Sequence, residues 1–349
     1  MTTGFSRLAA AAARAPVVLV ASRRGNVELW ANLVILTWAG VFLLWQGPGF
    51  ALTVGTVFAI WAILAVSLNL VVGFTGLLSI AHIGFFGIGA YAMAILTSGT
   101  SYEELRTDAI PTFGWPFFAA LPVSAVAAGL VAIAVGVVLN RFRDDIFVLV
   151  TFGFAIISYS VFLNWAELTR GAFGIHDIAR PAVGDLVLDS DAEFLAFAVL
   201  CLALVSLVSW LVVSSSFGRV LLAIREDEQA AEVFGYRVAR YKLVVWVISA
   251  MMAGLAGGLF SSWARFVDPY SFALLESILL VSIVIIGGLA TIWGSLLGVM
   301  TFVLLEEGMR FVPFLPNESI GQARQAVLGV LLVLLMLFRP QGLVGRYRL

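Results

Sequence analysis

Long apolar runs recur along most of this sequence, and shorter polar links separate them. A helix needs about 20 mostly apolar residues to cross the hydrocarbon core of a bilayer. The chain is 62% hydrophobic and only 12% charged, so it lacks the polar surface that a soluble fold requires. The pattern predicts an all-α polytopic membrane protein. We expect about ten transmembrane helices, some of them broken, near residues 29–46, 51–72, 75–97, 117–139, 146–165, 193–213, 243–263, 272–289, 293–312 and 325–338.

The basic residues between the apolar runs predict the orientation of the chain. Lys and Arg favour the cytoplasmic side of a membrane, and they gather before residue 28, at 141–143, between 214 and 242, and after residue 338. Arg14, Arg23 and Arg24 argue against a secretory signal at the Ala-rich start. We therefore expect a multi-pass protein of the inner (cytoplasmic) membrane, with cytoplasmic tails at 1–28 and 339–349, a transmembrane domain at 29–338 and both termini in the cytoplasm.

Residues 73–91 form an apolar stretch that is rich in glycine and contains His82. Each glycine costs roughly 1 kcal/mol relative to alanine in a water-exposed helix, so close packing against a neighbouring helix explains the glycines better. Small residues at steps of three or four predict that a neighbouring backbone approaches along one stripe, formed by Ala81, Gly84, Gly87, Ala90 and Ala94.

The same stretch places polar atoms beside aromatic rings at membrane depth. This combination suggests a broken helix that lines a solute path, with the candidate residues Thr75, Ser79, His82, Phe85 and Phe86. We expect a tight turn at residues 73–76, between the second and third runs. The alternative is a helix that only packs against its neighbours, with His82 bonded to a carbonyl group.

A weak internal repeat relates the two halves of the chain. Residues 288–292, Gly-Leu-Ala-Thr-Ile, resemble residues 76–80, Gly-Leu-Leu-Ser-Ile, and both lie in glycine-rich segments. Paired interruptions in the two halves are typical of the central region of a transporter, although five matched positions in apolar surroundings can also arise by chance.

Residues 214–242, named the coupling segment below, form the longest charged stretch on the expected cytoplasmic side. The part from Arg219 to Phe234 contains no Gly or Pro, and Gly235 follows it as a helix stop signal. Apolar residues among the charges predict a short helix that docks on a soluble partner. A solvated connector at the lipid headgroups is the alternative.

The coupling segment resembles that of the branched-chain amino acid ABC importer permeases, and specifically their LivM-like subunits. The resemblance rests on the run from Ala223 to Leu243, in which Gln229-Ala230-Ala231 precedes Gly235, although Gln replaces the usual Glu. It extends over roughly residues 60–345, through the stretches 67–91, 250–257, 285–294 and 337–342. One departure is the outer link at 171–181, where His176 and Asp177 are unexpected and leave the solute open.

Membership would imply a transport subunit without chemistry or cofactors of its own. Its expected partners are a homologous second permease (LivH-like), two ATP-binding subunits, an extracytoplasmic solute-binding protein and membrane lipid. ATP-driven motion of these subunits would push on the helix at 219–235 and drive alternating access. The residues that the resemblance assigns to ATPase coupling are Arg219, Arg225, Glu226, Glu228, Ala230, Ala231 and Gly235.

Other functions are less well supported by the residues. A phosphate-binding loop needs a Gly-Lys-Ser/Thr sequence, but the single lysine, Lys242, lies between Tyr241 and Leu243. The net charge of −1 gives no attraction to nucleic acid. Few ionisable residues lie inside the apolar runs, which disfavours an ion-coupled secondary transporter. The two histidines lie in separate segments, which disfavours an intramembrane metal enzyme. Urea and short amides remain alternatives to amino acids as the solute.

Overall fold

The computed structural model describes residues 47–98, 113–139, 142, 144–178, 180–183, 186–187 and 190–309, with short C-terminal stretches at 326–327, 329–334, 337 and 342–344. The described part is helical, as the composition predicts. Its long helices are α3 (Pro48–Thr75), α4 (His82–Thr97), α5 (Phe117–Leu139), α6 (Asp144–Asn164), α8 (Asp191–Ser214), α11 (Val238–Ala264), α12 (Leu274–Gly287) and α13 (Ile292–Met309).

Six helices in the described residues are long and apolar enough to cross a membrane, and α4 and α12 are shorter apolar helices. The expected span at 29–46 and the tail at 1–28 lie outside the described residues, and the span at 325–338 is described only in pieces. The structure therefore confirms an all-α polytopic membrane protein, while the total of ten spans stays a prediction.

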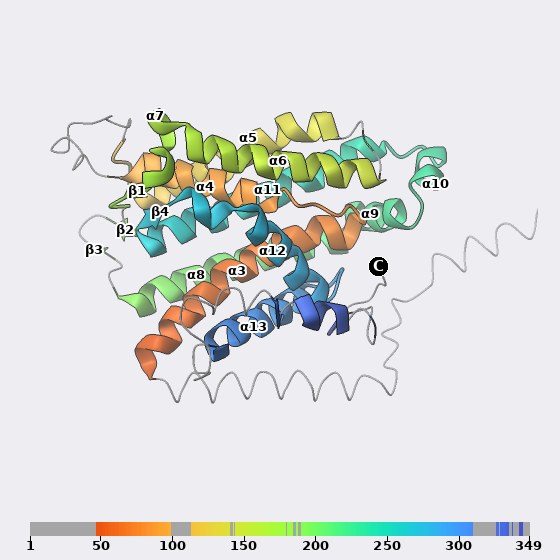
Figure 1. The fold of residues 1–349 in the computed structure, drawn as a ribbon. Helices are drawn as coiled ribbons and strands as arrows, with labels where there is room; N and C mark the ends of the chain where they lie inside the picture. The colour runs from red at the N-terminus through yellow and green to blue at the C-terminus, as the bar shows by residue number, and fades with distance from the viewer. Residues whose placement is uncertain are drawn as a thin grey trace, which may run out of the picture. The chain divides into compact units, whose positions relative to one another are not determined.

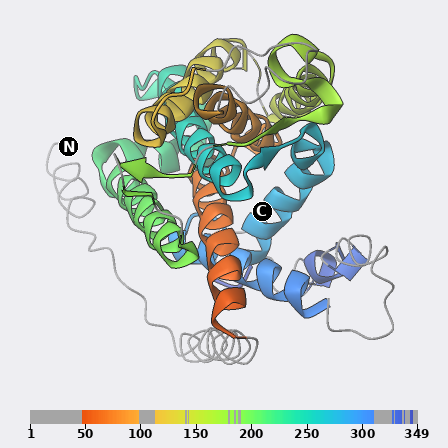
Figure 2. The same ribbon diagram turned by 90° about the vertical axis from the view of Figure 1, so that its left-hand side faces the viewer.

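Helix α3 lies at the centre of the described bundle. It packs against α8, α11 and α13, and Figure 2 shows it (orange) running between α8 (green) and α13 (blue). The residues of α3 from Ala59 to Thr75 are almost all apolar, and almost all of them are buried. A helix that is apolar on all sides has no face that favours water. Such a helix is typical of the core of a membrane bundle, where all of its neighbours are apolar.

Helices α4 and α11 pack with their backbones almost in contact. A Cβ atom added at Gly89 would lie 2.1 Å from the carbonyl oxygen of Gly254, and one added at Gly257 would lie 1.9 Å from the carbonyl oxygen of Phe86. The expected stripe is therefore only partly right. Gly84 and Gly87 face side chains of α6, whereas Gly89, which is outside the stripe, faces the backbone of α11 at Gly254.

The short elements lie at opposite ends of the bundle, as Figure 1 shows. One end, named the coupling end here, carries α9 (Ser216–Glu226) and α10 (Glu228–Val233). The other end, named the β end, carries α7 (Ala166–Thr169), η2 (Gly171–Phe173), η3 (Pro269–Phe272) and the strands β1 (Ile175–His176), β2 (Ala182–Val183), β3 (Leu186–Val187) and β4 (Phe266–Val267). Strand β1 pairs antiparallel with β4, and β2 pairs antiparallel with β3.

Candidate functional site

The first break in the bundle separates α3 from α4. Helix α3 continues to Thr75 and ends at Gly76, whose φ of 75° is a left-handed conformation that glycine adopts without strain. The predicted turn at 73–76 is therefore displaced, because residues 73–75 complete the last turn of α3 and a stretch without regular secondary structure leads to α4 at His82. The third span was predicted at residues 75–97, and the corresponding helix α4 begins seven residues later, at His82.

Several polar groups of the first break are bonded within the protein, as backbone at membrane depth requires. The Thr75 hydroxyl donates to the carbonyl oxygen of Val71 at 2.7 Å and accepts from the amide of Leu77 at 3.3 Å. The Ser79 hydroxyl accepts from the amide of Ala81 at 3.3 Å. Thr75 and Ser79 are thus used to shape the break, and both side chains are buried.

His82 is the first residue of α4 and is 1% exposed. Its Nε2 lies 2.6 Å from the Ser249 hydroxyl of α11, and that hydroxyl donates to the carbonyl oxygen of Ser67 in α3 at 2.5 Å. Because a hydroxyl has a single proton to donate, it accepts from the protonated Nε2 of His82. His82 Nδ1 is then an acceptor, and it has no hydrogen-bond partner among the described residues. The alternative interpretation bonded His82 directly to a carbonyl group, whereas here the Ser249 hydroxyl lies between His82 and the carbonyl oxygen of Ser67.

Phe85 and Phe86 lie in two separate aromatic clusters. Phe85 packs edge-on against Trp246 at 5.4 Å between ring centroids, and His82 packs edge-on against the same indole at 6.2 Å. Phe86 contacts Phe260 and Phe272 at 5.3 and 5.6 Å. The structure therefore brings His82 and Phe85 together with Trp246 and Ser249, and it places Phe86 in a different cluster.

The second break separates α12 from α13 at residues 288–291. Asn69, on the buried α3, spans it: its Oδ1 accepts from the Ala290 amide at 3.0 Å, and its Nδ2 donates to the Thr291 carbonyl at 2.8 Å and to the Ser295 hydroxyl at 2.7 Å. The two related sequences at 76–80 and 288–292 thus both interrupt helices. Sequence reasoning missed Asn69, although an amide inside an apolar run was a visible signal.

The C-terminal stretch at 342–344 adds to the second break. The amides of Leu343 and Val344 donate to the carbonyl oxygens of Ile286 and Gly287 at 2.9 and 3.0 Å. The Thr291 hydroxyl donates to the carbonyl oxygen of Val344 at 3.0 Å. This part of the expected cytoplasmic tail is therefore bonded to the transmembrane helices.

The expected single helix at 219–235 is wrong, because the coupling segment forms two helices. Asp227 takes an extended conformation between α9 and α10, and its Oδ1 accepts from the Ala230 amide at 2.9 Å. Aspartate is a favoured N-cap because its carboxylate satisfies an amide that has no partner in the first turn. The helix-stop signal at Gly235 is confirmed, with a φ of 87° directly after α10 and its C-cap Phe234.

Three coupling residues face their own chain rather than outward. The Arg225 guanidinium donates to the Gly73 carbonyl oxygen in the last turn of α3. Glu228 pairs with Lys242 of α11 at 2.5 Å. Ala231 is 3% exposed and packs against Val220, Ile224 and Val238, which explains its small size without an external partner.

The outward surface of the coupling segment is apolar at its tip. Arg219, Glu226 and Gly235 are exposed, and Ala230 is half-buried. Val233 and Phe234 are 86% and 82% exposed, which is unusual for large apolar side chains outside the membrane spans. Sequence reasoning treated these two residues as general apolar anchors and did not select them as site residues.

At the β end, His176 and Asp177 belong to a structured turn. His176 lies in β1 and stacks on Phe266 of β4 with ring centroids 4.3 Å apart. Asp177 follows with a φ of 56°. A Cβ atom at Gly174 would lie 2.3 Å from the carbonyl oxygen of Val267, so the glycine at this position permits the strand pair.

Comparison with known proteins relates the chain to membrane transport subunits. The family model for "Branched-chain amino acid transport system / permease component" matches residues 50–337. The high-affinity branched-chain amino acid transport system permease protein LivM of Escherichia coli K12 is 32% identical, and the match covers 90% of this chain and 74% of LivM. The corresponding protein LivH of Salmonella typhimurium is 24% identical over 82% of this chain and 91% of LivH. BraD of Pseudomonas aeruginosa is 25% identical over 84% of this chain and 94% of BraD. No solved structure was found to match the chain.

Proposed function

The chain belongs to the family of branched-chain amino acid transport system permeases, and we propose that it is the LivM-like subunit of an ATP-driven importer for branched-chain or related amino acids. The 32% identity to LivM over 90% of the chain carries this proposal. Because the chain also matches LivH, a second, homologous permease subunit is the proposed partner across the transport path.

ATP hydrolysis is assigned to two separate ATP-binding subunits. A phosphate-binding loop requires a lysine that reaches the phosphates, and the single lysine of this chain is engaged with Glu228. The coupling end is assigned to the cytoplasmic side of the inner membrane, and both termini are assigned to the same side. An extracytoplasmic binding protein would then deliver solute at the β end.

The function is tested by reconstitution in proteoliposomes. We expect leucine uptake that requires ATP, the binding protein and all four membrane-associated subunits, and no ATP binding or hydrolysis by this chain alone. Uptake driven by an ion gradient without the ATP-binding subunits would contradict the importer assignment. Uptake of urea or a short amide, with no uptake of leucine, would contradict the assignment of an amino acid as the solute.

We place the solute path beside the start of α4, where the candidate residues Thr75, Ser79, His82, Phe85 and Phe86 were predicted. The side chains of all five are buried within this chain. A path along them therefore requires a second conformation in which α4 moves relative to α11, as alternating access provides. His82 Nδ1, which has no hydrogen-bond partner among the described residues, is the polar atom that we expect a solute or water to contact in that conformation.

Replacing His82 with leucine is expected to lower leucine uptake by at least about tenfold, since it removes a buried hydrogen bond and a polar atom from the path. Uptake and co-purification of the partner subunits are measured together. Thr56→Val is the matched control, because this buried hydroxyl donates to the carbonyl oxygen of Leu52 within its own helix. Wild-type uptake by His82→Leu would leave His82 with a packing role alone.

We propose that the tip of the coupling segment binds an ATP-binding subunit through Val233 and Phe234, with Arg219, Glu226, Ala230 and Gly235 around it. Arg225, Glu228 and Ala231 then hold the segment on the bundle through the internal contacts described above. In this arrangement the exposed apolar side chains supply the affinity, and the buried residues transmit the motion.

Changing Phe234 to serine is expected to weaken co-purification of the ATP-binding subunits by about tenfold or more, because a large exposed aromatic side chain is a typical interface hot spot. The melting temperature of the purified chain should not change. Phe173→Ser is the matched control, since Phe173 has the same 82% exposure and lies at the β end. Equal loss of the ATP-binding subunits from both variants would contradict the assignment.

A further inference from the structure

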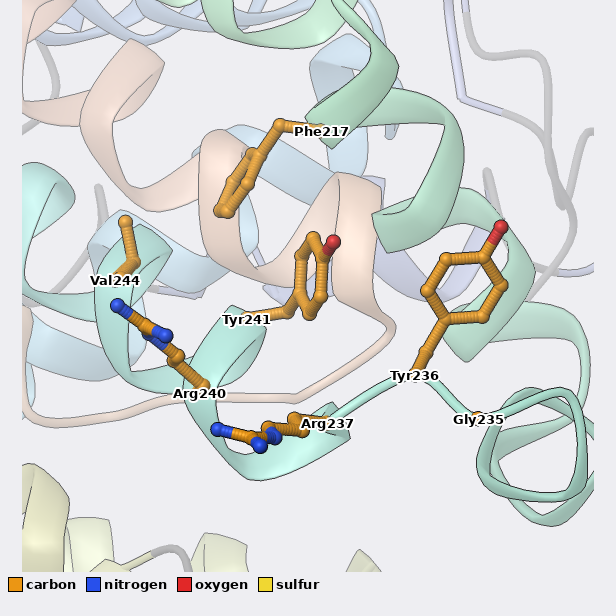
Figure 3. A pocket seen from close by; sticks show the side chains of 7 residues that line it. All are labelled: Phe217, Gly235, Tyr236, Arg237, Arg240, Tyr241 and Val244. Atoms are coloured by element: carbon orange, nitrogen blue, oxygen red, sulfur yellow. The ribbon is translucent and has the colours of Figure 1, made fainter.

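A pocket of about 430 Å³ lies at the start of α11, apart from the two breaks. Figure 3 shows its lining, in which Phe217 of α9 faces residues from the first turns of α11. Phe217 and Tyr241 stack with ring centroids 5.1 Å apart and form the apolar wall. Arg237, Arg240 and Val244 complete the side that α11 contributes.

The pocket carries positive charge that the described residues do not neutralise. Arg237 and Arg240 are both exposed, and within the described part of the chain neither forms an ion pair. Among the residues that the structure describes, no acidic side chain lines the pocket. Two guanidinium groups beside one cavity favour a ligand with an oxyanion such as phosphate, because Arg donates parallel hydrogen bonds that match its geometry.

The pocket lies at one end of a helix that is long enough to extend beyond the hydrocarbon core of a membrane. Helix α11 has 27 residues, which makes it about 40 Å long and thus longer than the hydrocarbon core of about 30 Å. Arg237 is the N-cap of α11 and Arg240 lies in its first turn, at the end of the helix that we place in the headgroup layer. Val244 lies one turn deeper and is 39% exposed, so it presents an apolar surface directly below the two charges.

Helix α8 also supports a position of the pocket near the lipid headgroups. Trp210 and Leu211 lie in the last two turns of α8, just before α9, and both side chains are exposed. Tryptophan is enriched where a spanning helix meets the headgroups. Exposed apolar side chains at the end of α8 and at the start of α11, together with two arginines at the start of α11, are features expected of a site for an anionic lipid.

We propose that this pocket binds the headgroup of an anionic phospholipid. Arg237 and Arg240 contact its phosphate, the Phe217–Tyr241 pair contacts the glycerol region, and an acyl chain lies along Val244. The lipid would then contact the coupling segment at α9 and the first turn of α11 at the same time. Anionic lipid therefore fixes the position from which the coupling segment acts.

The proposal is tested by native mass spectrometry of the full chain, purified in mild detergent and titrated with dioleoyl phosphatidylglycerol or dioleoyl phosphatidylcholine. We expect preferential retention of phosphatidylglycerol, with about fivefold weaker binding in Arg237→Gln and in Arg240→Gln. The matched control Arg265→Gln, at the opposite end of α11, should bind as the wild type does. Melting temperatures measured on the same samples exclude unfolding as the cause.

Several outcomes would overturn the proposal. Unchanged phosphatidylglycerol binding in both variants, or equal retention of phosphatidylcholine by the wild type, would show that the pocket does not select an anionic lipid. Displacement of the lipid by an equal concentration of glycerol 3-phosphate would identify a soluble-anion site. Unchanged lipid binding with loss of the ATP-binding subunits from both variants would assign the pocket to that protein interface.

Discussion

Replacing Gly257 with alanine is expected to prevent the bundle from forming a single stable species. The added methyl group would lie 1.9 Å from the carbonyl oxygen of Phe86 and 2.8 Å from the amide nitrogen of Ala90. Both atoms belong to the backbone of α4, so no side-chain rotation can relieve the overlap. Overpacking of a well-filled interior costs about 1–3 kcal/mol even when side chains can adjust, and we expect at least about 3 kcal/mol here.

The effect is measured as loss of the monodisperse peak in size-exclusion chromatography and as a lower melting temperature in detergent. Gly153→Ala is the matched control, since it makes the same change within α6 and an added Cβ atom there meets nothing within 4 Å. A Gly257→Ala chain as stable as the Gly153→Ala chain would show that α4 and α11 do not pack this closely.

The contrast between these glycines shows how far sequence reasoning reaches. Hydropathy predicted the helix at 117–139 with the bounds that α5 has, because Gly114 and Pro116 precede the apolar run and the polar residues Asn140 and Arg141 follow it. Glycine spacing predicted that α4 packs closely against neighbours. It did not reveal which glycine meets which neighbour, since that depends on the rotation and crossing of helices distant in the sequence.

In the candidate site, too, some features were predicted from the sequence and others were not. The sequence identified both glycine-rich interruptions and a charged coupling segment, and the structure confirms two breaks and helices in that segment. It did not identify Asn69, whose three hydrogen bonds reach residues more than 200 positions away. The sequence also could not indicate the direction in which Arg225 points, because its charge suits an external partner and an internal carbonyl group equally well.

Arg225 joins the coupling segment to the central helix in a specific way. A helix ends with carbonyl groups that lack intrahelical partners and with the negative end of its dipole. In α3 the Gly73 carbonyl is one of these groups, because the Leu77 amide donates to the Thr75 hydroxyl instead. The guanidinium of Arg225 supplies the missing donor and a positive charge. One helical turn earlier on α3, Asn69 is bonded to the second break, so motion of α9 has a hydrogen-bonded route to both breaks.

Replacing Arg225 with methionine is therefore expected to uncouple transport from ATP hydrolysis. Methionine keeps an unbranched apolar stem but cannot donate to the Gly73 carbonyl, and an unsatisfied buried acceptor costs about 1–3 kcal/mol. We expect leucine uptake per ATP hydrolysed to fall by at least about tenfold in reconstituted vesicles, while the ATP-binding subunits still co-purify through Val233 and Phe234.

Two further variants separate this role from a general effect of lost charge. Arg225→Lys keeps a donor and the charge, so it should retain part of the coupling. Arg265→Met removes an exposed arginine at the C-terminal end of α11, far from α9 in the sequence, and should couple normally. Loss of the ATP-binding subunits from Arg225→Met would mean that the residue holds the docking surface in place. A wild-type ratio of leucine uptake to ATP hydrolysis in Arg225→Met would contradict the route, because α9 would then move the bundle without its bond to α3.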